Sequence, residues 1–387
     1  MNRYKGPILS TLVLCTLFMC ISCHGQTNND LTIDKAVHIA LLNNASLQLE
    51  YKRIGSIYDK TEFLQNSTFA TASDPMNFSF IQNFLETLLI PMKKRISEQE
   101  IHILRNEILG KMIDVVARTK IAFHTLQIST SIHKIREQIA HSKALAYESA
   151  ILLRCAGNTT ELTIASKKME LERAKLAVTQ ALNFMNNCKE NVDDLIGLWV
   201  KDGSWSYTTE LELFSNTFLD TFHIERDSIQ NNLALQNRFE KIKQRAKELS
   251  IPTTDIFFDL SSNYPAFNIE KIHSIKVKSE MAYLWKQFTA EVVNIQSIVS
   301  KASTTYHHFH EEYMHARDEI LPCLKKTFDD ALLKHNAMQL GVFELLKAKE
   351  TLLEQEIICL EKECQFYTHK VFIQALSKGR VLPEKFR

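Results

Sequence analysis

One apolar stripe constrains this chain more than any other feature. From Met281 to Tyr313, apolar residues recur at intervals of three and four, the spacing that places them on one side of an α-helix and forms a coiled-coil seam. The stripe comprises Met281, Leu284, Phe288, Val292, Ile295, Val299, Ala302, Tyr306, Phe309 and Tyr313. A helix of this kind must pack its stripe against another helix.

The stripe leads into a helical hairpin. Pro322 lies inside the pattern, and because helical spacing resumes at once, it is expected to bend the helix rather than end it. The turn is predicted between Asn336 and Gly341, and a second apolar stripe then returns along the partner from Val342 to Leu360.

The composition agrees with long helices and argues against several classes of function. Among 387 residues there are only 9 glycines and 7 prolines, which indicates few turns. The 46 lysines and arginines are balanced by 45 acidic residues, so the chain has no basic field for nucleic acid. The sequence has no glycine-rich phosphate loop, no GxSxG, no CxxC and no HExxH. We therefore predict an all-helical rod that is not an enzyme and needs no cofactor.

Much of the chain is present twice. The pattern NN..LQ.....I begins at Asn43 and again at Asn231, an offset of 188 residues. The segment LRCAGNTTELTIASKKMELERAK around Gly157 matches LKHNAMQLGVFELLKAKETLLEQ, with Gly157 and Met338 at an offset of 181 residues. Gly157 is predicted to end a long helix that starts near residue 92. The stripe of that helix comprises Ile101, Leu104, Ile108, Met112, Val115, Ile128, Ile132, Ile135 and Ile139.

The lengths of these segments predict how each repeat packs. In each half the long helix exceeds its return arm by about 20 residues, or roughly 30 Å at 1.5 Å per residue. The short helix after each asparagine pair fills this difference if it stacks end to end on the return arm. Each half is then one long helix against two short ones.

The second hairpin carries a family resemblance. Its sequence HNAMQLGVFELLKAKETLL resembles the signature "Y..G..s..dLL.a...L" of the TolC or outer membrane efflux protein family, and Ile320-Leu321-Pro322 also occurs there. Met338 stands where the family has glycine, and His335 or Asn336 where it has tyrosine. The resemblance covers roughly residues 31–379. It implies a mainly α fold in which duplicated hairpins form the coiled-coil α-barrel of a homotrimer, twelve helices in all, with β-hairpins that close a membrane β-barrel.

Two inserts occupy the positions of those β-hairpins, at about residues 66–91 and 252–270. A membrane strand needs about 9 to 11 residues, so a hairpin needs roughly 20 and a turn. The first insert barely suffices. The second is too short once Pro252 and Pro265 are discounted, because proline interrupts a strand.

The N-terminal segment has the pattern of a bacterial export signal. Arg3 and Lys5 precede an apolar run that ends at Ile21, which is typical of a signal peptide. Cys20-Ile21-Ser22-Cys23 resembles a lipobox, so Cys23 is predicted to be lipidated; plain cleavage nearby is the alternative. The predicted organisation is 1–22 signal peptide, 23–30 lipidated N-terminus and linker, 31–197 first repeat, 198–230 equatorial connector and start of the second repeat, and 231–387 second repeat.

The resemblance implies a lipid-anchored component of the cell outer membrane with a long periplasmic part. It would be a passive trimeric efflux or secretion conduit, onto which a periplasmic adaptor protein and an inner-membrane transporter dock. The alternative is a structural or interaction lipoprotein that keeps the coiled-coil rods without the pore. The hairpin turns are expected at Gly157, Met338 and Gly341. Candidates for the pore constriction are Glu344 and Lys347, six and nine positions after Met338, although both also suit an ordinary helix start.

Two further sets of residues have side chains that could bind a metal or react. His308, Glu311 and His315 share one helical stripe and are weak candidates for metal chelation, but they also flank the coiled-coil seam, so no metal site is predicted. Beyond the N-terminal segment, the cysteines are predicted to pack as small apolar side chains. They are Cys155, Cys188, Cys323, Cys359 and Cys364.

Overall fold

The computed structural model describes residues 31–53, 98–197, 224–249 and 275–382. The signal peptide, Cys23 and its linker, the connector from 198 to 223 and both inserts lie outside these residues, so the predictions for them stay predictions. Within the described ranges, no helix combines the length and the apolar character needed to cross a membrane.

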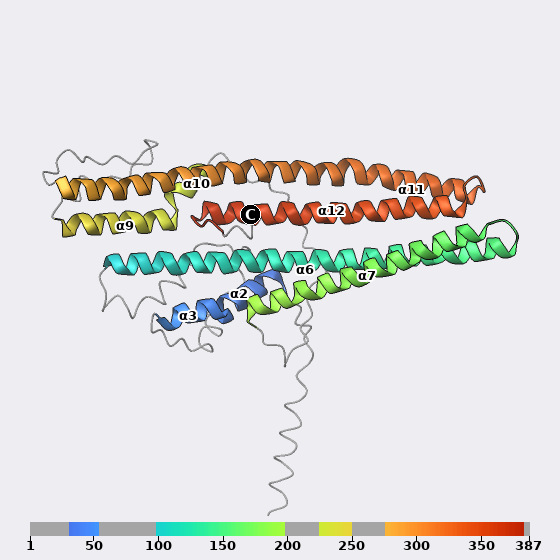
Figure 1. Cartoon of the computed structure of the whole chain (residues 1–387), viewed down its shortest axis with the longest axis horizontal. Helices are drawn as coiled ribbons and strands as arrows, with labels where there is room; N and C mark the ends of the chain where they lie inside the picture. The colour runs from blue at the N-terminus through green and yellow to red at the C-terminus, as the bar shows by residue number, and fades with distance from the viewer. Residues whose placement is uncertain (1–30, 54–97, 198–223, 250–274, 383–387) are drawn as a thin grey trace, which may run out of the picture.

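Two long helical hairpins dominate the structure (Figure 1). The first consists of α6 (Glu98–Cys155) and α7 (Glu161–Ile196). In the second, α10 (Ile275–His315), the π turn η4 (Ala316–Ile320) and α11 (Leu321–Asn336) form one long arm, and α12 (Val342–Ser377) returns. Short helices precede each hairpin: α2 (Ile33–Asn43) and α3 (Ala45–Arg53), then α8 (Ile224–Gln230) and α9 (Leu233–Glu248). The mainly α fold with a duplicated hairpin is confirmed.

The predicted stripes are the buried seams of the long arms. On α10, eight of the ten stripe residues are buried, and the other two, Leu284 and Phe309, are partly buried against the same core. On α6 the buried stripe residues are Ile108, Met112, Val115, Ile128 and Ile139. Because each fully buried large apolar side chain stabilises by about 1.5–3 kcal/mol, these seams are the main source of packing energy.

The π turn explains how the long arm passes Pro322 without ending. Pro322 lacks an N–H, and in an unbroken α-helix its ring would clash with the carbonyl four residues earlier. The turn widens just before it, where the Leu321 N–H donates to the carbonyl of Ala316, five residues back. The helix then resumes at once as α11. The prediction that Pro322 does not end the helix is confirmed.

Each return arm ends in a glycine pressed against an asparagine pair. Gly197 has φ 67°, and a Cβ atom there would lie 2.7 Å from the carbonyl oxygen of Asn43. Gly379 has φ 81°, and a Cβ atom there would lie 1.8 Å from the carbonyl oxygen of Asn231. Only glycine allows both the left-handed backbone and the close approach.

Hydrogen bonds hold the short helices onto the ends of the return arms. The Leu233 N–H, at the first residue of α9, donates to the carbonyl of Gly379 over 3.0 Å. Asn232 Oδ1 accepts from the Ala234 and Leu235 N–H groups and so caps α9. In the first repeat, Asn44 Nδ2 donates to the carbonyl of Leu195 over 3.0 Å. The predicted end-to-end stacking is confirmed in both repeats.

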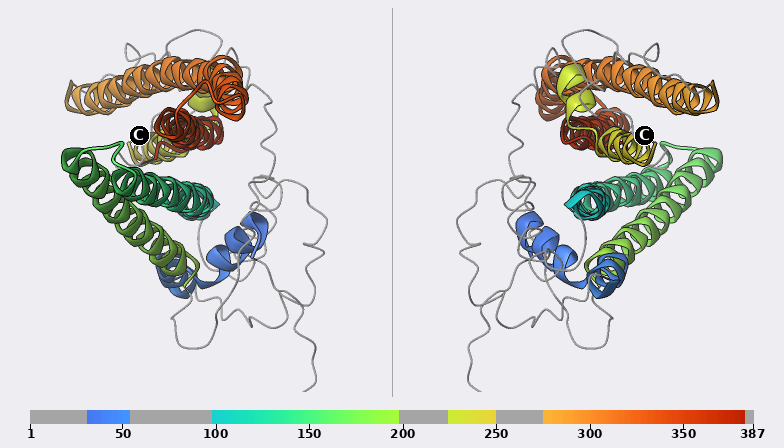
Figure 2. Two further views of the ribbon diagram at one scale, coloured as in Figure 1. Left: turned by 90° about the vertical axis from the view of Figure 1, so that its right-hand side faces the viewer. Right: turned by 90° about the vertical axis from the view of Figure 1, so that its left-hand side faces the viewer.

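The two repeats lie side by side along α6 and α12. Near the middle of the molecule, the Arg380 guanidinium donates to both carboxylate oxygens of Asp114 over 2.9 and 2.6 Å, which ties the end of α12 to α6. Seen along the long axis, the helices follow one another in the order α10, α12, α6, α7 (Figure 2). This layer is open, with α7 at one edge and the α10–α11 arm at the other.

Candidate functional site at the ends of the hairpins

Both hairpins turn at the same end of the molecule and with the same backbone geometry (Figure 1). After α6, the Gly157 N–H donates to the carbonyl of Arg154 and Gly157 has φ 79°. After α11, the Met338 N–H donates to the carbonyl of His335, and Met338 has φ 58°. Both are left-handed helix ends that normally favour glycine. The predicted turn at Gly157 and Met338 is therefore structurally equivalent in the two repeats.

The turns expose large apolar side chains. Met338 is 96% exposed and Leu162, in the first turn of α7, is 80% exposed. Leu152 and Leu333, near the ends of α6 and α11, are also exposed. Scattered apolar residues are ordinary on a protein surface, but four near two adjacent turns form a surface that a partner protein can cover.

Glu344 lies in the first turn of α12 and caps that helix. Its Oε2 atom accepts the N–H of Gly341 over 2.8 Å, which satisfies a backbone donor that the helix start leaves open. Lys347, one turn further on, lies 3.2 Å from Glu350 Oε2. Within the chain Lys347 thus pairs with Glu350, and the predicted constriction, which needs three copies of the chain, stays a prediction.

A cluster of charged side chains joins the two hairpins behind their turns. Lys143 of α6 donates to Glu350 of α12 over 2.7 Å and to Glu170 of α7 over 2.9 Å. Lys167 donates to the other oxygen of Glu170 over 2.9 Å. Lys143 and Glu350 have side chains only 15% and 11% exposed, so these bonds are partly shielded from water. This Lys143 cluster lies about 12 to 18 Å from the turns, judged from the rise per residue.

The electrostatics of the Lys143 cluster favour its charged form. Burial alone would lower the pKa of Lys143, but the hydrogen bonds and charges of Glu350 and Glu170 outweigh it and raise that pKa. Burial would raise the pKa of Glu170, but hydrogen bonds from Lys143 and Lys167 lower it overall. Lys143 and Glu170 thus remain ionised across the neutral range. The bond from Lys143 to Glu350 resists separation of the hairpins.

Sequence reasoning missed this cluster. Its residues are 27 and 207 positions apart along the chain, and each lysine or glutamate looks like an ordinary helix surface residue. A signal would exist only in a comparison of many related sequences.

The predicted weak metal candidates are not gathered into a site. His308 Nε2 lies 2.9 Å from Glu312, which also accepts from Lys362 over 2.6 Å. Across the described part of the chain, no three histidine, cysteine or acidic side chains are grouped so as to hold a metal ion.

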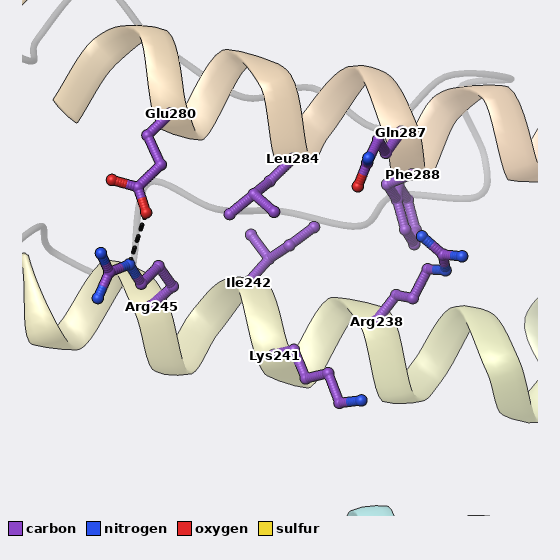
Figure 3. A pocket seen from close by; sticks show the side chains of 8 residues that line it. All are labelled: Arg238, Lys241, Ile242, Arg245, Glu280, Leu284, Gln287 and Phe288. Carbon is purple, nitrogen blue, oxygen red and sulfur yellow. Dashed lines mark hydrogen bonds and ion pairs between the residues drawn. The ribbon is translucent and has the colours of Figure 1, made fainter. Parts of the chain in front are cut away.

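A groove lies at the opposite end of the second repeat, between α9 and α10 (Figure 3). Its volume is about 510 Å³, and Leu284, Ile242 and Phe288 line its apolar part. Arg245 of α9 and Glu280 of α10 bridge it over 2.8 Å, and their hydrogen bond lowers the pKa of Glu280. The groove therefore has its principal charges paired across it and shows no marked chemistry of its own.

The comparisons bear on the whole chain. The sequence matches no family model and has no significant match among curated proteins. Solved structures are similar: the outer-membrane channel OprN has a TM-score of 0.61 and 12% identity, with 90% of each chain covered. The Campylobacter jejuni CmeC outer membrane channel has a TM-score of 0.58 and 12% identity over 100% of this chain and 98% of its own. The Vibrio cholerae outer membrane protein VceC has a TM-score of 0.57 and 10% identity over 92% and 98%.

These similarities extend over the duplicated hairpins, the stacked short helices and the equivalent turns described above, as the hairpin sequence predicted. The chain has the fold of the TolC-like outer-membrane channels.

Proposed function

We propose that this protein is a passive homotrimeric conduit of the outer membrane that works with a periplasmic adaptor and an inner-membrane transporter. The main support for this proposal is the fold, which is similar over nearly the full length of the chain to that of outer-membrane channels. A conduit needs no catalytic groups, which agrees with the absence of catalytic motifs in the sequence.

The open helical layer supports assembly with further copies. On α7, Leu162, Met169 and Leu176 recur at intervals of seven and are 80%, 46% and 58% exposed. A seven-residue repeat of apolar side chains is the pattern of a helix seam, and none of the helices described for one chain covers this seam. At the opposite edge, α11 has no buried residue along its described length.

The two edges differ, which restricts the symmetry of assembly. When the α7 edge of one copy packs against the α10–α11 edge of the next, the contact is head-to-tail, and such contacts close into rings when the rotation allows. Three copies with four helix strands each give the twelve-helix barrel of the resemblance. A barrel of this kind encloses the lumen that a conduit requires.

A charge-introducing variant tests this assembly. Leu162, Met169 and Leu176 replaced together by lysine should convert the trimer to monomer, because the changed side chains are exposed in one chain and covered only in the assembly. The matched control exchanges Glu172 and Lys175, an exposed pair on the same helix. Mass photometry in detergent is the readout. A wild-type protein that is monomeric at micromolar concentration contradicts the proposal.

The ends of the hairpins are the place where the adaptor would dock. Their exposed apolar side chains, including Met338 and Leu152, suit contact with another protein. In the trimer, three copies of Glu344 would form a ring of carboxylates near the narrowest point of the conduit, and the negative charge of such a ring attracts cations. Lys347 would then moderate the cation preference.

Lipidation of Cys23 would hold the mature protein in the outer membrane. The Cys23→Ala variant should lose the acyl groups that intact-mass analysis finds on the wild type. An unmodified N-terminus elsewhere in the wild-type protein would rule out the anchor.

A structural lipoprotein without a pore is the second candidate, and the short insert at residues 252–270 favours it. Planar-bilayer recording separates the two. Discrete conductance steps from the purified trimer are expected for a conduit, whereas a trimer without conductance would leave the structural role.

A further inference from the structure

The second hairpin is joined to the rest of its long arm by the π turn. Single π turns inside α-helices occur often at functional sites, because they interrupt the regular ladder. Before the turn α10 buries nine side chains, and after it α11 buries none. The turn therefore separates a firmly packed segment from a loosely packed one, which is the arrangement of a hinge.

An aromatic and histidine cluster packs directly before this turn. Phe366 of α12 is 2% exposed and lies between Tyr306 and Tyr313 of α10, at ring distances of 5.4 and 5.8 Å. His310 of α10 packs on the same ring at 5.1 Å. One turn further along α12, His369 stacks on Phe309 at 4.5 Å with only 18° between the ring planes.

We propose that this Phe366 cluster is a pH-sensitive hinge, which loosens the second hairpin at its base when His310 and His369 take up protons. The proposal concerns regulation and stands independently of the proposed conduit function.

The charges around His310 disfavour its protonation. From its own helix His307 and Glu311 face it, from the π turn Arg317, and from α12 Lys370. Burial first, and then His307, lower the pKa of His310, whereas Glu311 opposes the shift. Protonation therefore adds a positive charge beside those of Arg317 and Lys370, and burial already lowers the pKa of Lys370.

His369 is disfavoured as a cation by burial, which lowers its pKa. Both histidines thus have folded-state pKa values below the ordinary 6.5. Their stabilising contribution is complete above pH 6.5 and is lost as the pH falls through the lowered values. The hinge is therefore expected to loosen at mildly acidic pH.

The carboxyl group of Glu363 changes the stability of the cluster with pH in the opposite direction to the histidines. Burial raises the pKa of Glu363 above 4.5, although the charge of Arg317 opposes it. A raised carboxyl pKa means that the folded state gains stability as the pH falls, so Glu363 partly compensates the histidines. Substituting Glu363 and the histidines separately therefore distinguishes their effects on stability.

Hydrogen–deuterium exchange of the purified full-length protein tests the proposal. At pH 5.5, protection of segments 306–320 and 359–370 should fall relative to pH 7.5, after correction for intrinsic rates. The fall is at most about tenfold for each histidine, because pH 5.5 lies one unit below the ordinary histidine pKa of 6.5. The double variant His310→Gln, His369→Phe should lose less than about twofold, because the phenylalanine keeps the stack on Phe309 without titrating.

Three controls make the result specific. His308→Gln removes a histidine on the exposed side of the same helix and should leave the wild-type response intact. Glu363→Gln should enlarge the response, since the compensating group is gone. If the double variant does not fold, each single variant should retain about half of the response on a logarithmic scale. Unchanged protection in the wild type, or an equal loss in the histidine variants, overturns the proposal.

Discussion

Replacing Gly379 by alanine should destabilise this protein far more than the same change at an ordinary turn. Alanine in the left-handed region costs about 1 kcal/mol. At Gly379 the added Cβ would also lie 1.8 Å from the carbonyl oxygen of Asn231, a distance that forces the backbone apart. That displacement removes the hydrogen bond from the Leu233 N–H to Gly379, worth about 1 kcal/mol, and disturbs the stacking of α9 on α12. These two terms add to about 2 kcal/mol, and the disturbed stacking adds to this total.

Gly157 is the matched control for this change. It has a similar left-handed backbone, φ 79°, but no atom lies within 4 Å of a Cβ placed there. Gly157→Ala should therefore lose only the conformational part, about 1 kcal/mol. Urea unfolding followed by circular dichroism at the helix band measures both. If the two variants lose the same free energy, the end-to-end contact between α12 and α9 does not hold the second repeat together, and the reasoning fails.

Three further predictions concern the Lys143 cluster and the ends of the hairpins. Glu350→Gln should destabilise the protein at pH 7 by about 1.5–3 kcal/mol, the range for a hydrogen bond to a charged group. The loss should exceed that of Glu170→Gln, because Glu350 is the less exposed partner of Lys143. Because the pKa of Glu170 is lowered, its contribution to the free energy of unfolding is present above pH 4.5 and disappears as the pH falls through the lowered value. Urea titrations well below pH 4.5 should therefore no longer distinguish Glu170→Gln from wild type. In bilayer recordings, Glu344→Gln should lower and Lys347→Glu should raise the cation-to-anion permeability ratio; an unchanged ratio in both means that neither residue lines the constriction.

Local sequence patterns were enough to predict most of the fold. The stripe of α10, the breaks at the asparagine pairs and the helix end at Gly157 each depend on residues within a few turns of one another, and each is present as expected. The internal repeat added the equivalence of Gly157 and Met338, which no single segment indicates. The offset of 181 residues that aligns them also aligns the starts of α7 and α12.

Contacts between distant segments could not be predicted in this way. The ion pair of Arg380 with Asp114 joins residues 266 positions apart, and any of several arginines would suit the sequence equally well. The prediction that all five cysteines pack as apolar side chains is wrong for Cys155 and Cys323, which are exposed. Cys155 is the last residue of α6, at the hairpin turn, and Cys323 lies at the start of α11, which buries no residue. A residue type alone does not reveal either environment.

The π turn also sets the angular direction of everything beyond it. Each residue of an α-helix advances the chain by about 1.5 Å and turns it by about 100°. Deleting one residue within Ala316–Ile320 would therefore shorten the arm very little but rotate the whole of α11 by more than a quarter of a turn. During evolution, inserting or deleting one residue in the π turn could therefore turn a different side of the hairpin towards its surroundings. No side chain on the hairpin would have to change.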